Sequence, residues 1–211
     1  MAAKIKSIEV GPLEVNCYLL WDSDTLEAFI IDPGGDGPLI KDEVNSLGLK
    51  VKYVVNTHGH FDHVGADGEL RTFYSVPLAI HKADITLLKN ASGHAEIFGI
   101  KAPPQPSPDT FLTNNALLEA GSISLKVIHT PGHTPGGVCL YNEGEGLLFS
   151  GDTLFAGSVG RTDLEGGSSE ELMNSIKTRL LSLDDNVRVF PGHGPSTTIG
   201  DERRHNPFLS M

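Results

Sequence analysis

The pattern of hydrophobic and polar positions predicts short strands in the first third of the chain. Runs of β-branched, aromatic and aliphatic residues cover positions 5–10, 16–21 and 28–31. Residues 38–47 instead place apolar side chains at helical spacing, and Gly48 follows as a stop signal. A further β-branched run at 52–57 predicts a buried strand, so a helix joins two strands here.

The middle of the chain is less regular. Residues 64–73 predict a helix weakened by two glycines, 77–80 a short strand and 83–88 a short helix. Residues 90–110 are rich in glycine and proline and show no sustained periodicity. We expect them to form a long loop across the face of the same domain, because such loops in compact domains are often functional.

The second half repeats one arrangement, in which an apolar strand ends in a glycine-containing turn that carries one histidine or aspartate. The three predicted strands cover residues 123–128, 146–149 and 187–190. Between the last two, Ser168 and Glu171 form a capping box, and a helix with a leucine and isoleucine stripe follows. We therefore expect the strand ends to position the potential ligands and the helix to pack against the core.

Charge and length narrow the classes of function. The 211 residues hold 16 Lys plus Arg and 27 Asp plus Glu, for a net charge of −11. This balance argues against nucleic acid as a partner, and the length predicts a single domain over residues 1–211. No apolar run resembles a signal peptide or membrane span, so we expect a cytoplasmic protein with no membrane partner. Cys17 and Cys139 lie in apolar runs, which indicates buried reduced thiols.

The densest chemistry is the segment His58-Gly-His60-Phe-Asp62-His63, directly after the predicted strand at 52–57. Three imidazoles and a carboxylate in six residues predict a metal site. A strand-to-helix turn can direct His58 and His60 to one point, and Asp62 and His63 to a neighbouring one. The segment therefore has room for two cations.

Three later residues extend this set, because each follows a predicted strand in a glycine-containing turn. The seven candidate metal ligands are His58, His60, Asp62, His63, His133, Asp152 and His193. We expect the first metal to bind His58, His60 and His133 and the second Asp62, His63 and His193, with Asp152 as a bridge. Imidazole and carboxylate without thiolate suit two divalent ions, with zinc expected first and iron or manganese as alternatives.

Four other histidines and one aspartate lie outside this predicted ligand set. His81, His94, His129 and His205 lack a strand-end glycine turn, so we leave them out of the ligand set. Asp32 follows a strand and precedes Pro-Gly-Gly. It can either orient a ligating imidazole or cap the turn.

The ligand order His58-x-His60-x-Asp62-His63, His133, Asp152, His193 resembles the metallo-β-lactamase superfamily. The segments 130–136, 151–155, 160–163, 191–195 and 202–208 are similar to short glyoxalase II-like (hydroxyacylglutathione hydrolase-like) proteins. The resemblance implies an α/β fold, the αββα sandwich, with two mixed sheets face to face and helices outside. It also implies the ligand partition given above. Glyoxalase II enzymes usually continue into a longer helical segment that contacts glutathione, whereas this chain ends at Met211.

The resemblance implies a metal-dependent hydrolase of a (hydroxy)acyl-glutathione-type thioester, with Asp62 as a catalytic residue that orients the attacking water. Arg161 is the candidate substrate-binding cation, and the alternative is an arginine that only pairs with Asp163 or Glu165 to shape the loop.

Three other functions compete. A persulfide dioxygenase of the same superfamily would use one iron at His58, His133 and Asp152, but that branch tends to lose the histidine found here at 193. A nuclease is disfavoured by the acidic balance. A metal-binding module without enzymatic activity would not need an open coordination position.

Overall fold

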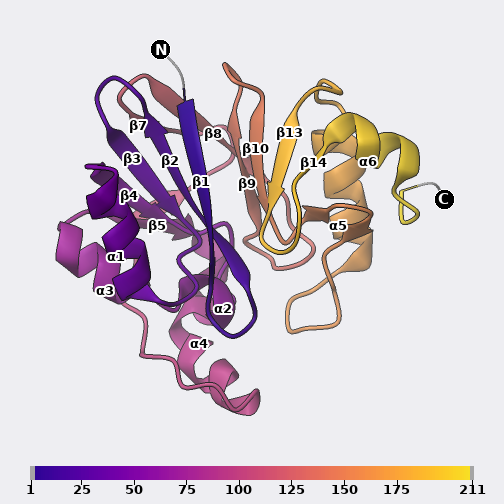
Figure 1. Cartoon of the computed structure of the whole chain (residues 1–211). Helices are drawn as coiled ribbons and strands as arrows, with labels where there is room; N and C mark the ends of the chain where they lie inside the picture. Colours follow the sequence, from indigo (N-terminus) through magenta and orange to yellow (C-terminus); the bar gives the residue numbers. More distant parts are fainter. Residues whose placement is uncertain (1–2, 210–211) are drawn as a thin grey trace.

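Two six-stranded sheets pack face to face in the computed structural model, which describes residues 3–209. Helices cover the outer surface of each sheet, so that the layers run helix, sheet, sheet, helix (Figure 1). This arrangement confirms the predicted αββα sandwich with two mixed sheets.

The first sheet contains the strands in sequence order, β1 to β6. They are β1 Ala3–Val10, β2 Val15–Asp22, β3 Glu27–Ile31, β4 Lys50–Val55, β5 Leu78–His81 and β6 Thr110–Leu112. The first three pair antiparallel, whereas β3 to β6 pair parallel. The carboxyl ends of β3, β4 and β5 therefore meet at one edge, where the histidine-rich segment leaves β4.

The second sheet has the order β14-β13-β10-β9-β8-β7. Its strands are β7 Leu117–Ala120, β8 Ile123–His129, β9 Val138–Asn142, β10 Leu147–Gly151, β13 Arg188–Pro191 and β14 Thr197–Thr198. Among these described strands, only β10 and β13 pair parallel. They bring Asp152 and His193 to the same edge, because each follows the end of its strand. A small hairpin of β11 Leu154–Phe155 and β12 Ser158–Val159 lies beyond β10.

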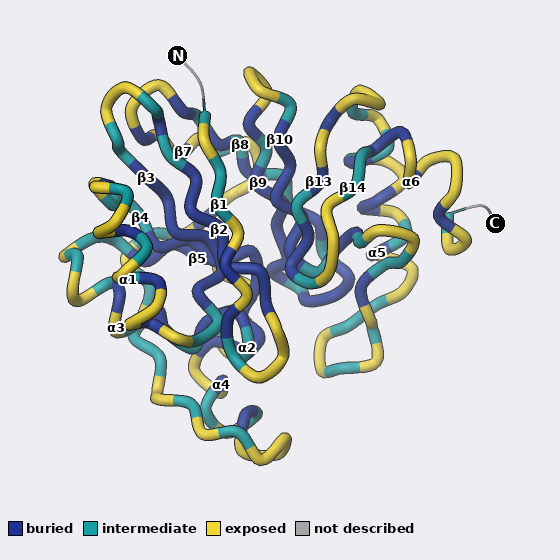
Figure 2. Tube along the Cα trace, in the orientation of Figure 1, coloured by how far each residue is buried: buried dark blue, intermediate teal, exposed yellow. Residues whose placement is uncertain are grey.

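Three apolar layers hold these elements together. The central one lies between the sheets and joins Phe29 and Ile31 of the first to Leu140 and Phe149 of the second. A second layer packs α1 Gly37–Ser46 and α3 Asp67–Tyr74 on the first sheet. A third packs α5 Ser169–Ser175, the π-helical turn η2 Ile176–Leu180 and α6 Ile199–His205 on the second sheet. Figure 2 shows the result as buried strands inside and exposed loops and helix faces outside.

The prediction of a loop over 90–110 is wrong for its first part. A 13-residue helix, α4, runs over Ile85–Ile97 after the short turn η1 Lys82–Asp84, and loop follows it. Ala91 and Ala95 are fully buried against Phe61 and Ile80, so tertiary packing overrides the weak helix propensity of Ser92 and Gly93.

The helix expected at 64–73 begins earlier and is split. The turn α2 covers Phe61–Val64, and α3 starts at Asp67 after a break at Gly65 and Ala66. Asp62 consequently lies in the first turn of a helix. Cys17 and Cys139 are buried free thiols, as predicted. Within residues 3–209, no helix combines the length and apolar character that a membrane crossing requires.

Candidate metal centre

All seven predicted ligands lie in turns or helix starts at the shared edge of the two sheets. Four follow β4: His58, His60 and, within α2, Asp62 and His63. The other three follow strands of the second sheet, with His133 after β8, Asp152 after β10 and His193 after β13. Both sheets therefore contribute to one cluster.

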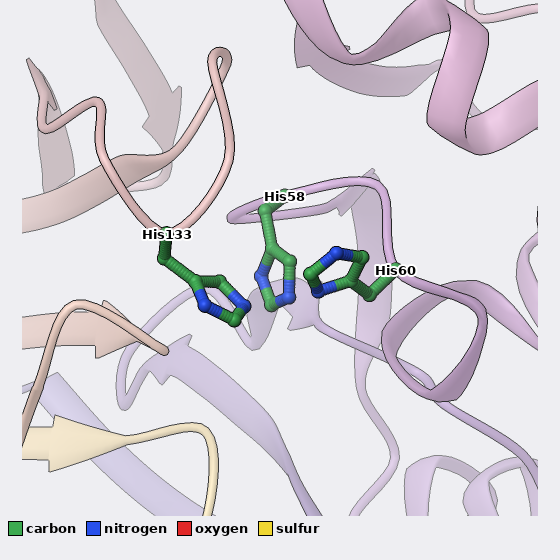
Figure 3. Close-up of side chains that lie close together, drawn as sticks. All are labelled: His58, His60 and His133. Carbon is green, nitrogen blue, oxygen red and sulfur yellow. The ribbon is translucent and has the colours of Figure 1, made fainter. Parts of the chain in front are cut away.

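One half of the cluster is built from three histidines. The rings of His58, His60 and His133 have centroids 4.6 to 4.9 Å apart and meet edge to face (Figure 3). One nitrogen from each lies within 4.8 Å of the others, a spacing that can hold a metal ion. All three side chains are buried.

The other half combines Asp62, His63 and His193, which form a second group with ligand atoms within 4.8 Å. Asp62 Oδ2 lies 3.4 Å from His193 Nε2 and 3.7 Å from His63 Nε2. His193 is the most exposed of the three, with 31% of its side chain accessible, so this half of the centre faces the opening.

Asp152 lies between the two halves. Its Oδ1 is 3.4 Å from His63 Nε2, and its Oδ2 is 3.6 Å from His133 Nε2 and 3.7 Å from His193 Nε2. One carboxylate therefore contacts a residue of the first group and two residues of the second. This is the position that a bridging ligand takes between two cations.

Several donor atoms of the cluster are buried without a hydrogen bond. Among the described residues, His58 Nε2, His63 Nε2, His133 Nε2 and Asp152 Oδ1 have no hydrogen-bond partner. Leaving a buried polar atom unpaired costs about 1–3 kcal/mol. These atoms converge from both groups, and bonds to metal would satisfy them, so the donor set fits two divalent cations.

Hydrogen bonds determine which nitrogen each imidazole presents. Thr57 Oγ1 donates its single proton to Asp32 Oδ2 over 2.7 Å, so it must accept from His58 Nδ1 at 3.1 Å. His133 Nδ1 likewise donates to the Arg161 carbonyl oxygen at 2.7 Å. In the neutral tautomer that these hydrogen bonds select, Nε2 of each ring faces the cluster as an acceptor, which is the form that ligates metal.

Asp32 connects two of these histidines. Its carboxylate accepts from the Thr57 backbone N–H at 2.7 Å and from the Thr57 hydroxyl, and Oδ2 lies 3.2 Å from His63 Nδ1. Of the two roles left open by the sequence, orienting an imidazole is therefore the one that the contacts support. Asp32, His58 and His63 also lie close enough to form a third ligand group.

The pKa values of histidines in the cluster are shifted in opposite directions. Burial, followed by the neighbouring imidazoles, lowers the pKa of His58 well below its usual value and that of His60 to about 3. Burial also lowers the pKa of His63, but Asp152, Asp62 and Asp32 outweigh it and raise that pKa to about 10. The second group thus attracts positive charge, which a cation can supply in place of a proton.

A buried carboxylate that the sequence did not reveal holds the two histidine loops together. Asp84 is fully buried and accepts from Gly59 N at 2.9 Å, Thr134 Oγ1 at 2.7 Å and Gly136 N at 2.6 Å. It thereby joins the loop of His58 and His60 to the loop of His133. Its partners are 25 to 52 residues away, so no local pattern marks it.

The His193 turn is held by the start of β2. The Asn16 amide donates to the carbonyl oxygens of Pro191 at 3.1 Å and Gly194 at 2.9 Å, and its backbone N–H donates to Gly192 O. Gly192 itself has no room for a side chain, because a Cβ atom there would lie 2.2 Å from Asp152 Oδ1. This close approach requires glycine beside the cluster.

Arg161 lies at the rim of the cavity over the cluster and is paired. Its guanidinium makes two 2.8 Å hydrogen bonds to Asp163, and both side chains are more than half exposed. The structure thus shows the loop-shaping contact, in a position that also faces the cavity.

The histidines that were left out of the ligand set stay outside the three ligand groups found in residues 3–209. His81 and His129 stack on each other with centroids 4.3 Å apart, and His205 ends α6. His94 lies on α4 and lines the cavity without joining a group.

Comparison with known proteins agrees with this geometry. The family model described as the metallo-beta-lactamase superfamily matches residues 10–193. Hydroxyacylglutathione hydrolase GloC of Haemophilus influenzae is 38% identical over 213 residues, which cover 98% of each chain.

Two solved structures share the whole fold. The crystal structure of BLEG-1 B3 metallo-beta-lactamase has a TM-score of 0.92 at 40% identity and covers 99% of this chain and 100% of that one. The crystal structure of TTHA1623 in a di-iron-bound form has a TM-score of 0.90 at 40% identity and covers 97% and 100%. With the family model matching most of its length, the chain belongs to the metallo-beta-lactamase superfamily.

Proposed function

We propose that this chain is a metal-dependent hydrolase that cleaves thioesters of the (hydroxy)acyl-glutathione type. The observation that carries the proposal is the convergence of unpaired Nε2 atoms from both histidine groups on the shared carboxylate of Asp152. The similarity to hydroxyacylglutathione hydrolase GloC supports the choice of thioester.

The proposed ligands follow the two groups seen in the structure. His58, His60 and His133 would hold one cation, Asp62, His63 and His193 the other, and Asp152 both. Zinc suits this set, and iron or manganese are alternatives, since the similar TTHA1623 has a di-iron-bound form. Two such cations lower the pKa of bound water to about 7 and polarise a carbonyl.

The chain's own residues orient the reactants. Burial raises the pKa of Asp62, but the charges of His63 and His193 outweigh this and hold it below its usual value. Asp62 is therefore ionised and can accept a hydrogen bond from the attacking water, which is the catalytic role that we assign to it. We assign to Arg161, at the rim, the binding of a substrate carboxylate in exchange for its contact with Asp163.

A second candidate function rests on a smaller subset of the same residues. His133 Nε2 lies 3.6 Å from Asp152 Oδ2, and the His58 and His133 rings are 4.8 Å apart. Two histidines and one carboxylate are the ligands of mononuclear iron oxygenases, so a persulfide dioxygenase is the alternative. It leaves Asp62, His63 and His193 without a role, which favours the hydrolase.

One experiment separates the two chemistries, because zinc is redox-inert. Protein reconstituted with zinc alone should hydrolyse S-D-lactoylglutathione without oxygen, and a chelator should abolish the activity. Oxygen consumption on glutathione persulfide with iron alone, together with no hydrolysis under zinc, manganese or iron, would instead establish the dioxygenase.

The thiols and the net charge support proposals for the cellular location and the partner of the protein. We propose a cytoplasmic location, because the buried free thiols of Cys17 and Cys139 suit a reducing compartment. We propose a small thioester rather than a nucleic acid as the partner, since the net charge is −11.

A further inference from the structure

A cavity of about 650 Å³ opens over the cluster of proposed ligands. His60, Asp62, His133, Asp152 and His193 form part of its wall. Most of the remaining lining is apolar and includes Leu13, Leu87, Ile97, Phe98, Phe155 and Leu164. The cavity therefore has a polar wall at the cluster and an apolar cleft beside it, formed by these six side chains.

Helix α4 builds one wall of this cleft through its periodicity. Leu88, Ala91 and Ala95 are buried in the core, whereas Leu87 and the Ile97–Phe98 end of the helix face the cavity. Leu87, His94 and Phe98 follow one another at spacings of seven and four residues, so they lie on one side of the helix, and Ile97 flanks them. At the end of the helix, Ile97 and Phe98 therefore remain exposed beside the cavity, whereas Leu87 is buried.

The cleft exposes large side chains that would ordinarily be buried. Ile97 is 79% exposed, Phe98 55% and Leu13, at the tip of the β1–β2 hairpin, 42%. Apolar surface gains about 25 cal/mol for each Å² removed from water. Exposed apolar groups gathered around one opening mark a binding site, because a ligand that covers them recovers this energy.

Ring contacts connect the cleft directly to the proposed reaction centre. Phe98 packs on Phe61, with centroids 5.3 Å apart, and Phe61 immediately precedes Asp62 in α2. On the other side, the Phe155 ring is 6.4 Å from that of His193. A group bound in the cleft would therefore lie next to the thioester carbonyl that water at the cluster would attack.

The charges around the cavity determine which part of a thioester the cleft can take. Arg161 is the one Lys or Arg among the described lining residues, and Asp163 already pairs with it. Glu165 adds a negative charge to the lining. Burying the carboxylates of a glutathione group among the apolar side chains of the cleft, away from Arg161 at the rim, would cost desolvation energy that no cation of the cleft compensates. The acyl group is the part that matches the cleft.

We propose that the apolar cleft binds the acyl group of the substrate, and that the preferred substrates are thioesters with an extended aliphatic or aromatic acyl chain rather than a short one such as lactoyl. The inference rests on the proposed thioester hydrolase activity. Leu13, Ile97 and Phe98 are its specificity-determining residues, and the thiol part of the substrate extends past the rim at Arg161.

The test keeps the thiol constant and lengthens the acyl chain, from S-acetyl- to S-butanoyl-, S-hexanoyl- and S-octanoylglutathione, with zinc-loaded protein. We expect kcat/KM to rise about two- to fourfold for each added methylene. The product carboxylates, acetate to octanoate, give a readout without turnover. Their Kd by calorimetry should fall by about the same factor for each methylene.

Variants test whether the dependence of kcat/KM on acyl chain length arises from the cleft. The double variant Ile97→Ser, Phe98→Ser should lower the octanoyl-to-acetyl ratio of kcat/KM by about tenfold or more. Leu13→Ser, on a different element, should lower it as well and guards against a folding defect in α4. Leu117→Ser is the matched control, because Leu117 is 59% exposed on β7 and does not line the cavity. Its ratio should equal that of the wild type.

The outcomes separate the two proposals. Hydrolysis of the whole series with no dependence on chain length would overturn the acyl cleft and leave the thioesterase standing. No hydrolysis of any member, with carboxylate binding that still tightens with length, would overturn the thioesterase and retain an apolar ligand cleft. Equal slopes in the wild type and in both cleft variants would show that Leu13, Ile97 and Phe98 do not bind the chain.

Discussion

Asp32 Oδ2 lies 3.2 Å from His63 Nδ1, although 31 residues separate the two along the chain. The same carboxylate accepts two hydrogen bonds from Thr57, whose hydroxyl holds His58. One residue outside the proposed ligand set therefore orients an imidazole in each half of the cluster. Such partners raise the basicity of a ligating histidine and keep its ring in place.

We therefore expect Asp32→Ala to weaken metal binding by about 10- to 100-fold, the range seen when such orienting groups are lost. Titration of the metal-free variant with zinc against a chromophoric chelator measures the affinity. Asp42→Ala is the matched control, because Asp42 is exposed on α1, and it should bind zinc like the wild type. An unchanged affinity in Asp32→Ala would show that the carboxylate only stabilises the turn.

Metal stoichiometry tests the partition of the ligands. The wild type should hold two zinc ions per chain by elemental analysis. His193→Ala removes a ligand from the second group alone and should retain about one ion, whereas Asp152→Ala removes the shared carboxylate and should weaken both sites. A wild type that saturates at one ion, with His193→Ala unchanged in content and activity, would refute the dinuclear centre.

Asp84 should be as important for stability as for activity. Asp84→Ala leaves the buried N–H groups of Gly59 and Gly136 and the Thr134 hydroxyl without their acceptor. At about 1–3 kcal/mol for each unpaired group, the free energy of unfolding should fall by about 3 kcal/mol or more. Urea unfolding of the metal-free protein measures this loss, and Thr134→Ser, which retains a hydroxyl, should lose less.

Asp67 makes stability depend on pH. Burial raises its pKa well above the usual value, and the hydrogen bond from Asn56 offsets this only in part. The unfolded chain, with an ordinary pKa of about 4, releases this proton at lower pH than the native chain. The contribution of Asp67 to stability is therefore greatest below about pH 4 and falls as the pH rises towards its native pKa.

Asp67→Asn should remove this fall. Relative to the wild type, the variant should gain up to about 1.4 kcal/mol of unfolding free energy for each pH unit above about pH 4. Urea unfolding of metal-free protein between pH 4 and pH 7 provides the measurement. Asp42→Asn should run parallel to the wild type, and a parallel curve for Asp67→Asn would mean that Asp67 is ionised in the native state.

The contact between Arg161 and Asp163 predicts the direction in which KM changes when either residue is replaced. If Arg161 binds a substrate carboxylate, Asp163→Asn frees the guanidinium and should lower KM for a glutathione thioester. Arg161→Lys loses the two-pronged geometry and should raise KM severalfold. An increase of KM in both variants would indicate that the pair serves only to shape the loop.

The seven residues that the sequence predicts as ligands lie together in the structure, because each follows an apolar strand and lies in or beside a glycine-containing turn. That pattern is local and can be read from a dozen residues around His133, Asp152 or His193. The correct fold class follows from the family resemblance that these motifs carry, and the predicted order of strands and helices is compatible with it.

What the sequence does not reveal depends on distant contacts. The helix over 90–97 forms because Ala91 and Ala95 pack on residues of other elements, a contribution that local propensity cannot register. Asp84 joins two loops whose residues are far away in the chain, so its role appears only when they meet. The apolar cleft depends in the same way on the end of α4 lying beside a β-hairpin tip.

Because the seven proposed ligands come from both sheets, metal binding should affect how the two halves of the protein open in solution. Neither half of the sandwich contains a complete set of ligands, so a bound pair of ions would cross-link the two sheets at their shared edge. Breathing motions that part the halves would then have to release metal first. Amide hydrogens of β4 and β10 should thus exchange with solvent more slowly when both ions are bound. Metal loss would then become the first step towards unfolding and degradation of the protein.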